Sequence, residues 1–134
     1  MAETERQRER LEQVRKDFEV TYRFYSPEEG GRKSGPPAQL YRSDWSYDGD
    51  DIAETGIYMI WPIFLDQNGS IIDPDVFVPS QGIAQMFIVN EEVRESVHAR
   101  RLRPGVRGYL MEGDKRVAEA VVTRLLELSD AAIR

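Results

Sequence analysis

The N-terminal residues 3–17 mix acidic and basic side chains and carry few apolar ones. Their apolar side chains in helical spacing are Leu11 and Val14, followed by Phe18. This pattern predicts a solvent-exposed helix that is held to the rest of the protein by one narrow apolar stripe. We therefore assign residues 1–17 to an N-terminal helical arm. A loose arm without a stable helix is the alternative.

From residue 18 onward, apolar positions recur at every second residue. The segment FEVTYRFY places Phe18, Val20, Tyr22 and Phe24 on one side of an extended chain. The segment LYRSDWSYDG, residues 40–49, repeats this alternation with aromatic groups on one side. A period of two is typical of a β-strand with one buried face, so each segment predicts a strand.

The middle of the chain predicts further strands. Residues 55–66, TGIYMIWPIFLD, are apolar and β-prone, and Pro62 indicates an edge strand or a bend. Asn68-Gly69 favours a tight hairpin turn, because both residue types tolerate positive φ angles. Residues 75–89 predict two short strands separated by the segment 79–82, which begins with proline and ends with glycine.

The C-terminal third predicts one more strand and a closing hairpin. Residues 91–105, EEVRESVHARRLRPG, predict a strand that ends at Pro104-Gly105. Residues 106–128 predict a hairpin that turns at Gly113-Asp114. We expect the last residues, 129–134, to form a flexible tail.

Many short strands with glycine and proline between them predict an all-β fold. A β-sandwich or a β-barrel would satisfy this pattern. We favour a closed antiparallel β-barrel over residues 18–128, because closure leaves no long apolar edge exposed. The chain of 134 residues is long enough for one such domain with a single core.

Composition narrows the function classes. No apolar run approaches the roughly 18 residues of a membrane span, so we expect no membrane contact. The first ten residues lack the apolar stretch of a secretion signal, so we expect a cytoplasmic protein. The absence of cysteine excludes disulfides, thiolate metal ligands and a cysteine nucleophile. The net charge of -6 provides no general attraction to nucleic acid.

The residues that usually carry catalysis are sparse. No glycine-rich phosphate-binding motif is present, and the single histidine, His98, has no second histidine or cysteine with which to bind a metal. Two groups of acids and polar residues are candidate cation sites, but solvated turns explain them better: Asp44, Asp48, Asp50 and Asp51, and Asp66, Asn68, Ser70 and Asp73. We therefore expect no enzyme activity, no cofactor and no metal site. An enzyme that uses His98 or the first acidic group is the third choice.

A basic segment stands out in this acidic chain. Its members are Arg94, Arg100, Arg101, Arg103 and Arg107, with His98 among them. One interpretation is an exposed strand whose charges keep its edge soluble. The other is a binding surface for phosphate groups or for an acidic partner, because the guanidinium group matches such oxyanions.

Several short blocks resemble one known domain. FEVTYRFYSPEEGGR and YRSDWSY are similar to the beginning of the third, C-terminal β-barrel domain of translation elongation factor Tu, which typically shows F-E-x-x-V-Y, E-G-G-R and Y-R-P-Q-F-Y-F. The matching positions are Phe18, Glu19, Tyr22, Glu29, Gly30, Gly31, Arg32, Tyr41, Arg42, Trp45 and Tyr47. PGVRGYLMEGDKRVAEAVV resembles the closing hairpin of that domain through Gly105, Arg107, Leu110, Glu112, Gly113, Val117, Val121 and Val122.

The resemblance covers about residues 18–126, with Thr55-Gly56 and IAQMFIV in the expected order between the two ends. It implies a closed barrel like domain III of elongation factor Tu. Residues 62–73 then form an extra hairpin insertion, and the N-terminal helix is also additional. Because the GTPase domain and the second barrel have no counterpart here, we expect no binding of GTP.

The resemblance also suggests where partners bind. In that family, the loop after the first strand lies beside a surface that contacts aminoacyl-tRNA. Together with the basic segment, this implies a set of candidate binding residues: Glu29, Gly30, Gly31, Arg32, Lys33, Tyr41, Arg42, Arg100, Arg101 and Arg103. The H-T-P-F-F motif of the family is replaced by KSGPPAQ in this chain.

Three functions are consistent with the sequence. The leading hypothesis is a non-catalytic module that binds another protein, either a translation component or a protein that targets the elongation factor and is bound by this chain as a decoy or immunity-type mimic. The second is a barrel that binds tRNA or other RNA through Arg32, Lys33 and the arginines of residues 94–107. The third is the enzyme considered above.

Overall fold

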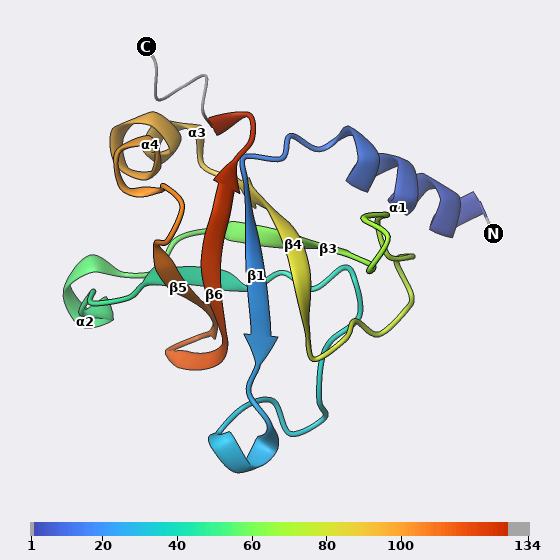
Figure 1. Cartoon of the computed structure of the whole chain (residues 1–134), viewed down its shortest axis with the longest axis horizontal. Helices are drawn as coiled ribbons and strands as arrows, with labels where there is room; N and C mark the ends of the chain where they lie inside the picture. The colour runs from blue at the N-terminus through green and yellow to red at the C-terminus, as the bar shows by residue number, and fades with distance from the viewer. Residues whose placement is uncertain (1, 129–134) are drawn as a thin grey trace.

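Strand β1 (Phe18–Phe24) is formed by the alternation that is visible in the sequence. In the computed structural model, which describes residues 2–128, the side chains of Phe18, Val20, Tyr22 and Phe24 are buried, whereas Thr21 is exposed. β1 lies between β4 and β6 and pairs with each of them in antiparallel orientation. The first strand of the sequence is therefore an interior strand of the sheet (Figure 1).

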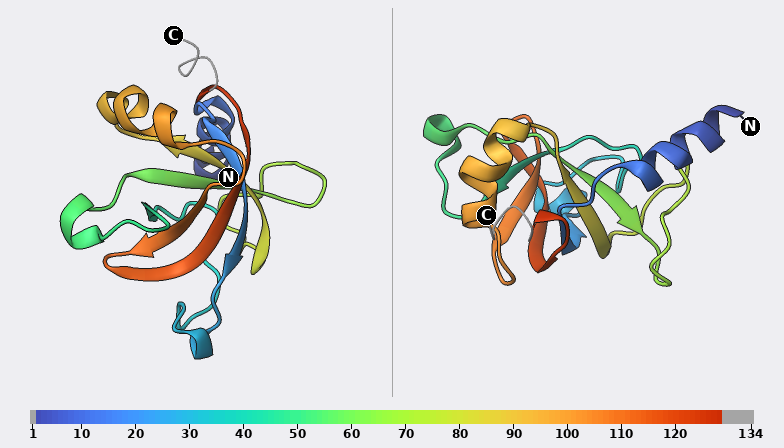
Figure 2. Two further views of the ribbon diagram at one scale, coloured as in Figure 1. Left: turned by 60° about the vertical axis from the view of Figure 1, so that its left-hand side comes forward. Right: turned by 90° about the horizontal axis from the view of Figure 1, so that it is seen from above.

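The fold is mostly β, as predicted. The remaining strands are β2 (Asp44–Tyr47), β3 (Ile60–Leu65), β4 (Gln81–Ile88), β5 (Arg107–Glu112) and β6 (Lys115–Leu125). They form one antiparallel sheet in the order β2-β5-β6-β1-β4-β3. Figure 2 shows that this sheet curls strongly, as half of a barrel does. The predicted hairpin over residues 106–128 is confirmed as β5 and β6, with Gly113 at φ 61° in the turn.

The two outermost strands meet at one point. Trp45 of β2 forms an isolated bridge with Tyr58, which lies just before β3. The Trp45 amide donates to the Tyr58 carbonyl at 2.8 Å, and the Tyr58 amide donates to the Trp45 carbonyl at 2.9 Å. Pro62 lies in β3, which is an outermost strand of the sheet and so needs no ladder hydrogen bond on its free edge.

The concave side of the sheet holds an aromatic core. Trp45 is fully buried and packs edge-to-face against Phe18 and Tyr47, with ring centroids 5.6 and 5.8 Å apart. Gly108 on β5 makes room for the indole ring, because a Cβ atom at this position would lie 2.1 Å from it. A larger residue at Gly108 would displace the central side chain of the core.

The predicted N-terminal helix is confirmed as α1 (Ala2–Gln13). The Lys16 ammonium donates to the carbonyls of Leu11 and Glu12, at 2.6 and 2.7 Å, and so satisfies the end of the helix. Three short elements connect the strands: η1 (Pro27–Glu29), α2 (Ile52–Thr55) and the helical run described next. No helix within residues 2–128 is long and apolar enough to cross a membrane.

The strand predicted for residues 91–105 is wrong. This segment is helical and consists of α3 (Glu91–Val93), the π-helix η2 (Arg94–His98) and α4 (Ala99–Arg101). The Asn90 side chain caps its start by accepting from the Glu92 amide at 2.9 Å. Arg94, His98 and Leu102, spaced four residues apart, are buried on one side, which is a helical period.

Two other predicted strands are shorter than expected. Residues 75–89 contain one strand, β4. Before it, Phe77 forms only an isolated bridge with Ala38, and Pro79 has no amide hydrogen to extend the pairing. The strand predicted for residues 40–49 is limited to β2, since the chain turns at Tyr41, whose amide donates to the Ala38 carbonyl at 3.2 Å. The predicted tail, 129–134, lies outside the described residues.

The hairpin turn predicted at Asn68-Gly69 is confirmed. Leu65 and Ile71 bridge across it, and Gly69 has φ 82°. The Asp66 carboxylate accepts from the amides of Asn68 and Ser70 at 2.8 and 3.0 Å. The Asp66 carboxylate therefore stabilises the turn. This role agrees with the interpretation of the segment as a solvated turn.

Candidate binding surfaces

The loop between β1 and β2 has its own local order. Ser26 and Glu29 form a capping box: the Glu29 amide donates to the Ser26 hydroxyl at 3.3 Å, and the Ser26 amide donates to the Glu29 carboxylate at 2.9 Å. Gly30 then has φ 91°, a left-handed conformation that favours glycine. Gly31 is needed for space, because a Cβ atom there would lie 2.1 Å from the Tyr25 carbonyl oxygen.

Glu29 is held on the outer face of the sheet. Its carboxylate accepts from the Arg23 guanidinium at 2.9 Å, and Arg23 also contacts Glu119 at 3.3 Å. The hydrogen bonds from Arg23 and from the Ser26 amide lower the pKa of Glu29 to about 2. Glu119 also accepts from the Tyr25 hydroxyl at 3.1 Å. These groups stabilise the loop against the sheet.

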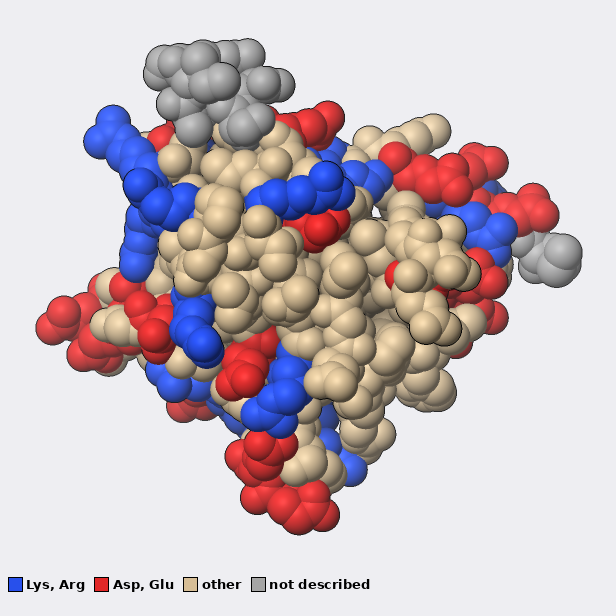
Figure 3. Space-filling view, viewed as in Figure 1, with Lys and Arg blue, Asp and Glu red and all other residues tan. Residues whose placement is uncertain are grey.

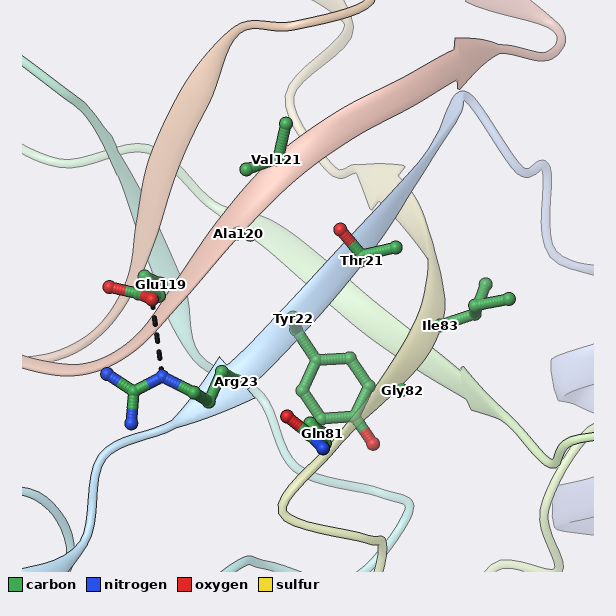
Figure 4. Close-up of a pocket in the computed structure, with 9 residues that line it drawn as sticks. All are labelled: Thr21, Tyr22, Arg23, Gln81, Gly82, Ile83, Glu119, Ala120 and Val121. Carbon is green, nitrogen blue, oxygen red and sulfur yellow. Dashed lines mark hydrogen bonds and ion pairs between the residues drawn. The ribbon is translucent and has the colours of Figure 1, made fainter.

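Arg23 and Glu119 border a depression of about 450 Å³ on the outer face of β4, β1 and β6 (Figure 4). Thr21, Ile83 and Val121 lie next to each other across these three strands. Figure 4 shows the Arg23–Glu119 ion pair beside this row, two residues further along β1 and β6. The depression therefore presents a short row of small and apolar side chains beside an ion pair.

Arg32 and Tyr41 belong to a second cluster, which fastens the loop to β5. The Arg32 guanidinium and the Tyr41 hydroxyl donate to the carboxylate of Glu112. The Arg32 guanidinium also lies over the Tyr41 ring, 4.9 Å from its centroid, and donates to the Gly35 carbonyl at 2.9 Å. Burial and the Glu112 carboxylate raise the pKa of Tyr41. These two candidate residues thus have internal partners, whereas Lys33 is exposed.

The neighbouring residue Arg42 lines a groove between α1 and β3. Its guanidinium lies 4.7 Å from the centroid of the Trp61 ring. The groove has a volume of about 340 Å³ and is lined by Gln7, Arg10, Leu11, Val14, Gln39, Leu40, Tyr41, Arg42, Trp61, Pro62, Ile63 and Phe87. It brings together side chains from four separate parts of the chain, so the sequence alone did not reveal it.

Apolar side chains are also exposed beside this groove. The segments 36–41 and 76–78 lie side by side: Ala38 bridges Phe77, the Gln39 amide donates to the Val76 carbonyl at 3.1 Å, and the Val78 amide donates to the Pro37 carbonyl at 2.9 Å. Three large apolar residues of these segments are exposed, Leu40 to 41%, Val76 to 46% and Phe77 to 76%. We call these three residues the apolar patch. Leu40 belongs to the patch and to the groove.

The basic segment does not form a single surface. Arg94 is buried and pairs with Asp17 at 2.8 Å. Arg101 donates two hydrogen bonds to Asp50, at 3.0 and 2.9 Å, and lies 3.9 Å from the centroid of the Tyr47 ring. Arg100 and Arg103 are exposed, and Arg103 donates to the Arg100 carbonyl at 2.8 Å.

The two predicted groups of cations also lie far apart. The loop with Arg32 and Lys33 follows the end of β1, whereas α3 and α4 lie near the beginning of this strand (Figure 1). Figure 3 shows basic side chains interspersed with acidic ones around a broad uncharged area over the middle of the sheet. The sequence placed these cations in one candidate set, and the structure does not bring them together.

His98 is completely buried. Its Nδ1 atom lies 2.6 Å from the Tyr47 hydroxyl, and its ring lies edge-to-face against Tyr58 with centroids 4.7 Å apart. Burial raises the pKa of Tyr47, so we assign its hydroxyl as the donor to Nδ1. Within residues 2–128, the other ring nitrogen, Nε2, has no hydrogen-bond partner. Burial, helped by the nearby Arg101, lowers the pKa of His98 to about 4.

This buried histidine predicts a pH-dependent stability. In the unfolded chain a histidine has a pKa of about 6.5, so it binds a proton at a pH where folded His98 remains neutral. Protons therefore favour unfolding, and the free energy of unfolding should fall by about 2 kcal/mol between pH 8 and pH 5. Urea denaturation across this range measures the change. The carboxylates with lowered pKa values, such as Glu29 and Glu112, contribute stability that is lost mainly below pH 5, outside this pH range.

The variant His98→Gln is the control, since it is expected to show little pH dependence above pH 5. A wild-type stability that is constant over this range, or a dependence that persists in the variant, would contradict the assignment to His98.

Three members of the first acidic group, Asp48, Asp50 and Asp51, have structural partners. Within the described part of the chain, no three residues of the types His, Cys, Asp or Glu lie together as a metal site would require. The first acidic group is used in other ways: Asp48 accepts from the Tyr109 hydroxyl at 2.7 Å, Asp50 pairs with Arg101, and Asp51 caps α2.

Comparisons with known proteins do not assign the chain to a family. No protein-family model matches the sequence, and no curated protein matches it at a significant level. The function must therefore be inferred from the surfaces described above.

Proposed function

We propose that this chain is a non-catalytic module that binds another protein. We further propose that its scaffold is a closed barrel of the kind found in the third domain of elongation factor Tu, which the sequence resembles. The bridge between Trp45 of β2 and Tyr58, which lies just before β3, brings the two edges of the curled sheet together at one end and supports this part of the proposal.

The apolar patch is the observation that carries the proposed function. Leu40, Val76 and Phe77 keep much of their surface exposed and lie on two paired segments, whereas the other exposed large apolar residues among the described ones, Met59 and Ile83, lie elsewhere in the chain. Exposed apolar side chains that gather beside a groove mark surfaces that bind other proteins. Burial of such side chains against a partner is favourable by about 25 cal/mol per Å² of apolar surface.

The resemblance suggests the class of partner. A scaffold like the third domain of elongation factor Tu would be recognised by a translation component, or by a protein that normally targets the elongation factor. In the second case this chain acts as a decoy or an immunity-type mimic. The additional α1 lines the groove, and the segment after β3 contacts α1 through the Arg8–Asp73 ion pair, which is consistent with a partner that differs from those of the elongation factor.

Binding of tRNA or other RNA is the alternative. Arg100 and Arg103 are exposed and available for it. Arg32 and Arg101, in contrast, are already paired with Glu112 and Asp50. A new RNA contact would have to compete with these ion pairs, so the geometry favours a protein partner.

Affinity capture with purified components tests the proposal. The wild-type chain should retain a protein from native extract, and the same protein, once purified, should bind directly. The double variant Leu40→Ser/Phe77→Ser should weaken this binding at least about tenfold, because it removes two exposed apolar side chains. Ile83→Ser is the matched control: Ile83 is exposed to 39%, close to Leu40 at 41%, but lies on the outer face of β4.

Recovery of RNA alone, with salt-sensitive binding that is lost on charge reversal of Arg100 and Arg103, would replace this proposal with the RNA alternative. Equal loss of binding in the Ile83 control and in the patch variant would show that the patch is not the interface.

A further inference from the structure

The groove between α1 and β3 has an apolar floor. Leu11 of α1 and Val14, which directly follows this helix, line it on one side, and Trp61 of β3 and Phe87 of β4 line it on the other. The sequence predicted that Leu11 and Val14 would dock the helix, but the structure leaves both partly accessible at the groove. Apolar side chains that face a hollow of this kind gain free energy when another apolar group fills it.

Helix α1 is anchored at points outside this floor. The Arg8 guanidinium forms an ion pair with Asp73 in the segment after β3. At the other end, just after the helix, the Arg15 guanidinium donates to the Ile88 carbonyl of β4 at 2.7 Å. Figure 2 shows α1 extending away from the sheet beside the loop that follows β3. The groove is therefore a space between two anchored elements.

The charges at the groove are of one sign. Arg10 and Arg42 line it, and no aspartate or glutamate is among its lining residues. In the described part of the chain, neither arginine forms an ion pair, whereas eight other arginines do: Arg6, Arg8, Arg15, Arg23, Arg32, Arg94, Arg101 and Arg124. In a chain of net charge -6, these two arginines without ion pairs give the groove a local positive charge.

The position of Arg42 favours binding of a carboxylate. Its guanidinium lies over the Trp61 ring, 4.7 Å from the centroid, and this cation–π contact restrains the group. A guanidinium has five N–H donors and can bind a carboxylate in a bidentate manner. The hollow of about 340 Å³ is at the small end of ligand sites, so it holds one or two large side chains.

We infer that the groove binds an acidic segment of a partner protein, with one apolar side chain in the hollow and neighbouring carboxylates on Arg10 and Arg42. The inference rests on the proposed function, because it specifies which kind of partner segment the module recognises. Charge complementarity selects the acidic segment over a neutral or basic one. The apolar patch, which shares Leu40 with the groove, extends the interface.

Synthetic peptides test this recognition. Three labelled peptides of equal length carry one phenylalanine flanked by glutamates, by glutamines or by lysines, and fluorescence anisotropy measures their binding to the full chain. The glutamate peptide is expected to bind at least about tenfold more tightly than the glutamine peptide, and its affinity should fall as salt rises. The lysine peptide should bind weakest.

Charge reversal provides the sharper test. The double variant Arg10→Glu/Arg42→Glu is expected to reverse the order and prefer the lysine peptide. Arg100→Glu/Arg103→Glu is the matched control, since it changes the same charge on exposed residues of another part of the molecule and should leave the order unchanged. Circular dichroism confirms that each variant is folded.

Several results would overturn the inference. Equal binding of the three peptides would make the groove an apolar site without charge selection, and saturable binding of octanoate without any peptide binding would make it a small-molecule site. Absence of peptide binding, while the purified partner still binds through the apolar patch, would refute the groove and leave the proposed function intact. Failure of the partner capture itself would refute the proposed function instead.

Discussion

Replacement of Asp17 with alanine is expected to lower the free energy of unfolding by about 3–5 kcal/mol. Asp17 is completely buried, and its carboxylate accepts from three donors: Arg94 Nε at 2.8 Å, Arg15 Nε at 2.8 Å and the Ile88 amide at 2.9 Å. Arg94 also donates to the Glu127 carbonyl at 3.2 Å. Loss of the carboxylate leaves the buried Arg94 charge unpaired and the Ile88 amide without its acceptor.

This carboxylate joins the start of β1, the end of β4 and the π-helix, so its loss affects three elements at once. Urea denaturation of wild type and variant measures the effect. Asp75→Ala, at an exposed acidic position, is the matched control and should change stability by less than about 0.5 kcal/mol.

A second variant separates the cost of leaving the Arg94 charge unpaired from the cost of losing the other contacts of the Asp17 carboxylate. The double replacement Asp17→Leu/Arg94→Met removes both charges, and it should recover much of the stability lost in Asp17→Ala. If Asp17→Ala unfolds at the same urea concentration as wild type, the ion pair does not contribute as described.

Gln39 is the second position at which a large effect is expected. Its buried side-chain amide acts on the free edge of β3 as a neighbouring strand would: Oε1 accepts from the Phe64 amide at 2.8 Å, and Nε2 donates to the carbonyls of Phe64 and Ile72 at 2.7 and 2.8 Å. Gln39→Leu preserves the approximate size but leaves the Phe64 amide and the Ile72 carbonyl unsatisfied. We expect a loss of about 2–5 kcal/mol, because each buried unpaired group costs about 1–3 kcal/mol.

Hydrogen exchange distinguishes this loss from a general packing defect. The Phe64 amide should exchange much faster in Gln39→Leu than in wild type, whereas amides of β1 and β6 should change only with global stability. Leu40→Ser, one residue away and exposed, is the control for local disturbance. Unchanged protection of the Phe64 amide would show that the glutamine side chain is not its partner.

The sequence predicted the strands whose signal is local. In β1 and in the hairpin of β5 and β6, alternation and turn glycines such as Gly113 are sufficient. It failed for α3, η2 and α4 because the buried residues of that helical run include Arg94 and His98. A polar residue is recognisable as a core residue only through its partners, and Asp17 and Tyr47 lie far away in the sequence.

The candidate site was predicted less well for the same reason. The sequence grouped Arg32, Arg42 and Arg101 by type, but their roles depend on Glu112, Trp61 and Asp50, which only the fold brings near them. The groove was missed entirely, since α1, the segment before β2, β3 and β4 each contribute only a few of its residues. The succession Asn90-Glu91-Glu92 was a local signal that could have corrected the strand prediction, because an N-cap residue followed by acidic residues is typical of the start of a helix.

The position of β1 between β4 and β6 determines when this protein can fold during synthesis. Phe18 pairs with Met86 on one side and with Leu125 on the other, so the first strand of this sheet is fully paired only after its last strand has been synthesised. Until β6 has been translated, the nascent chain exposes one unpaired edge of a strand rich in aromatic residues, which favours aggregation. Such non-local pairing also predicts slow folding compared with a helical protein of this length.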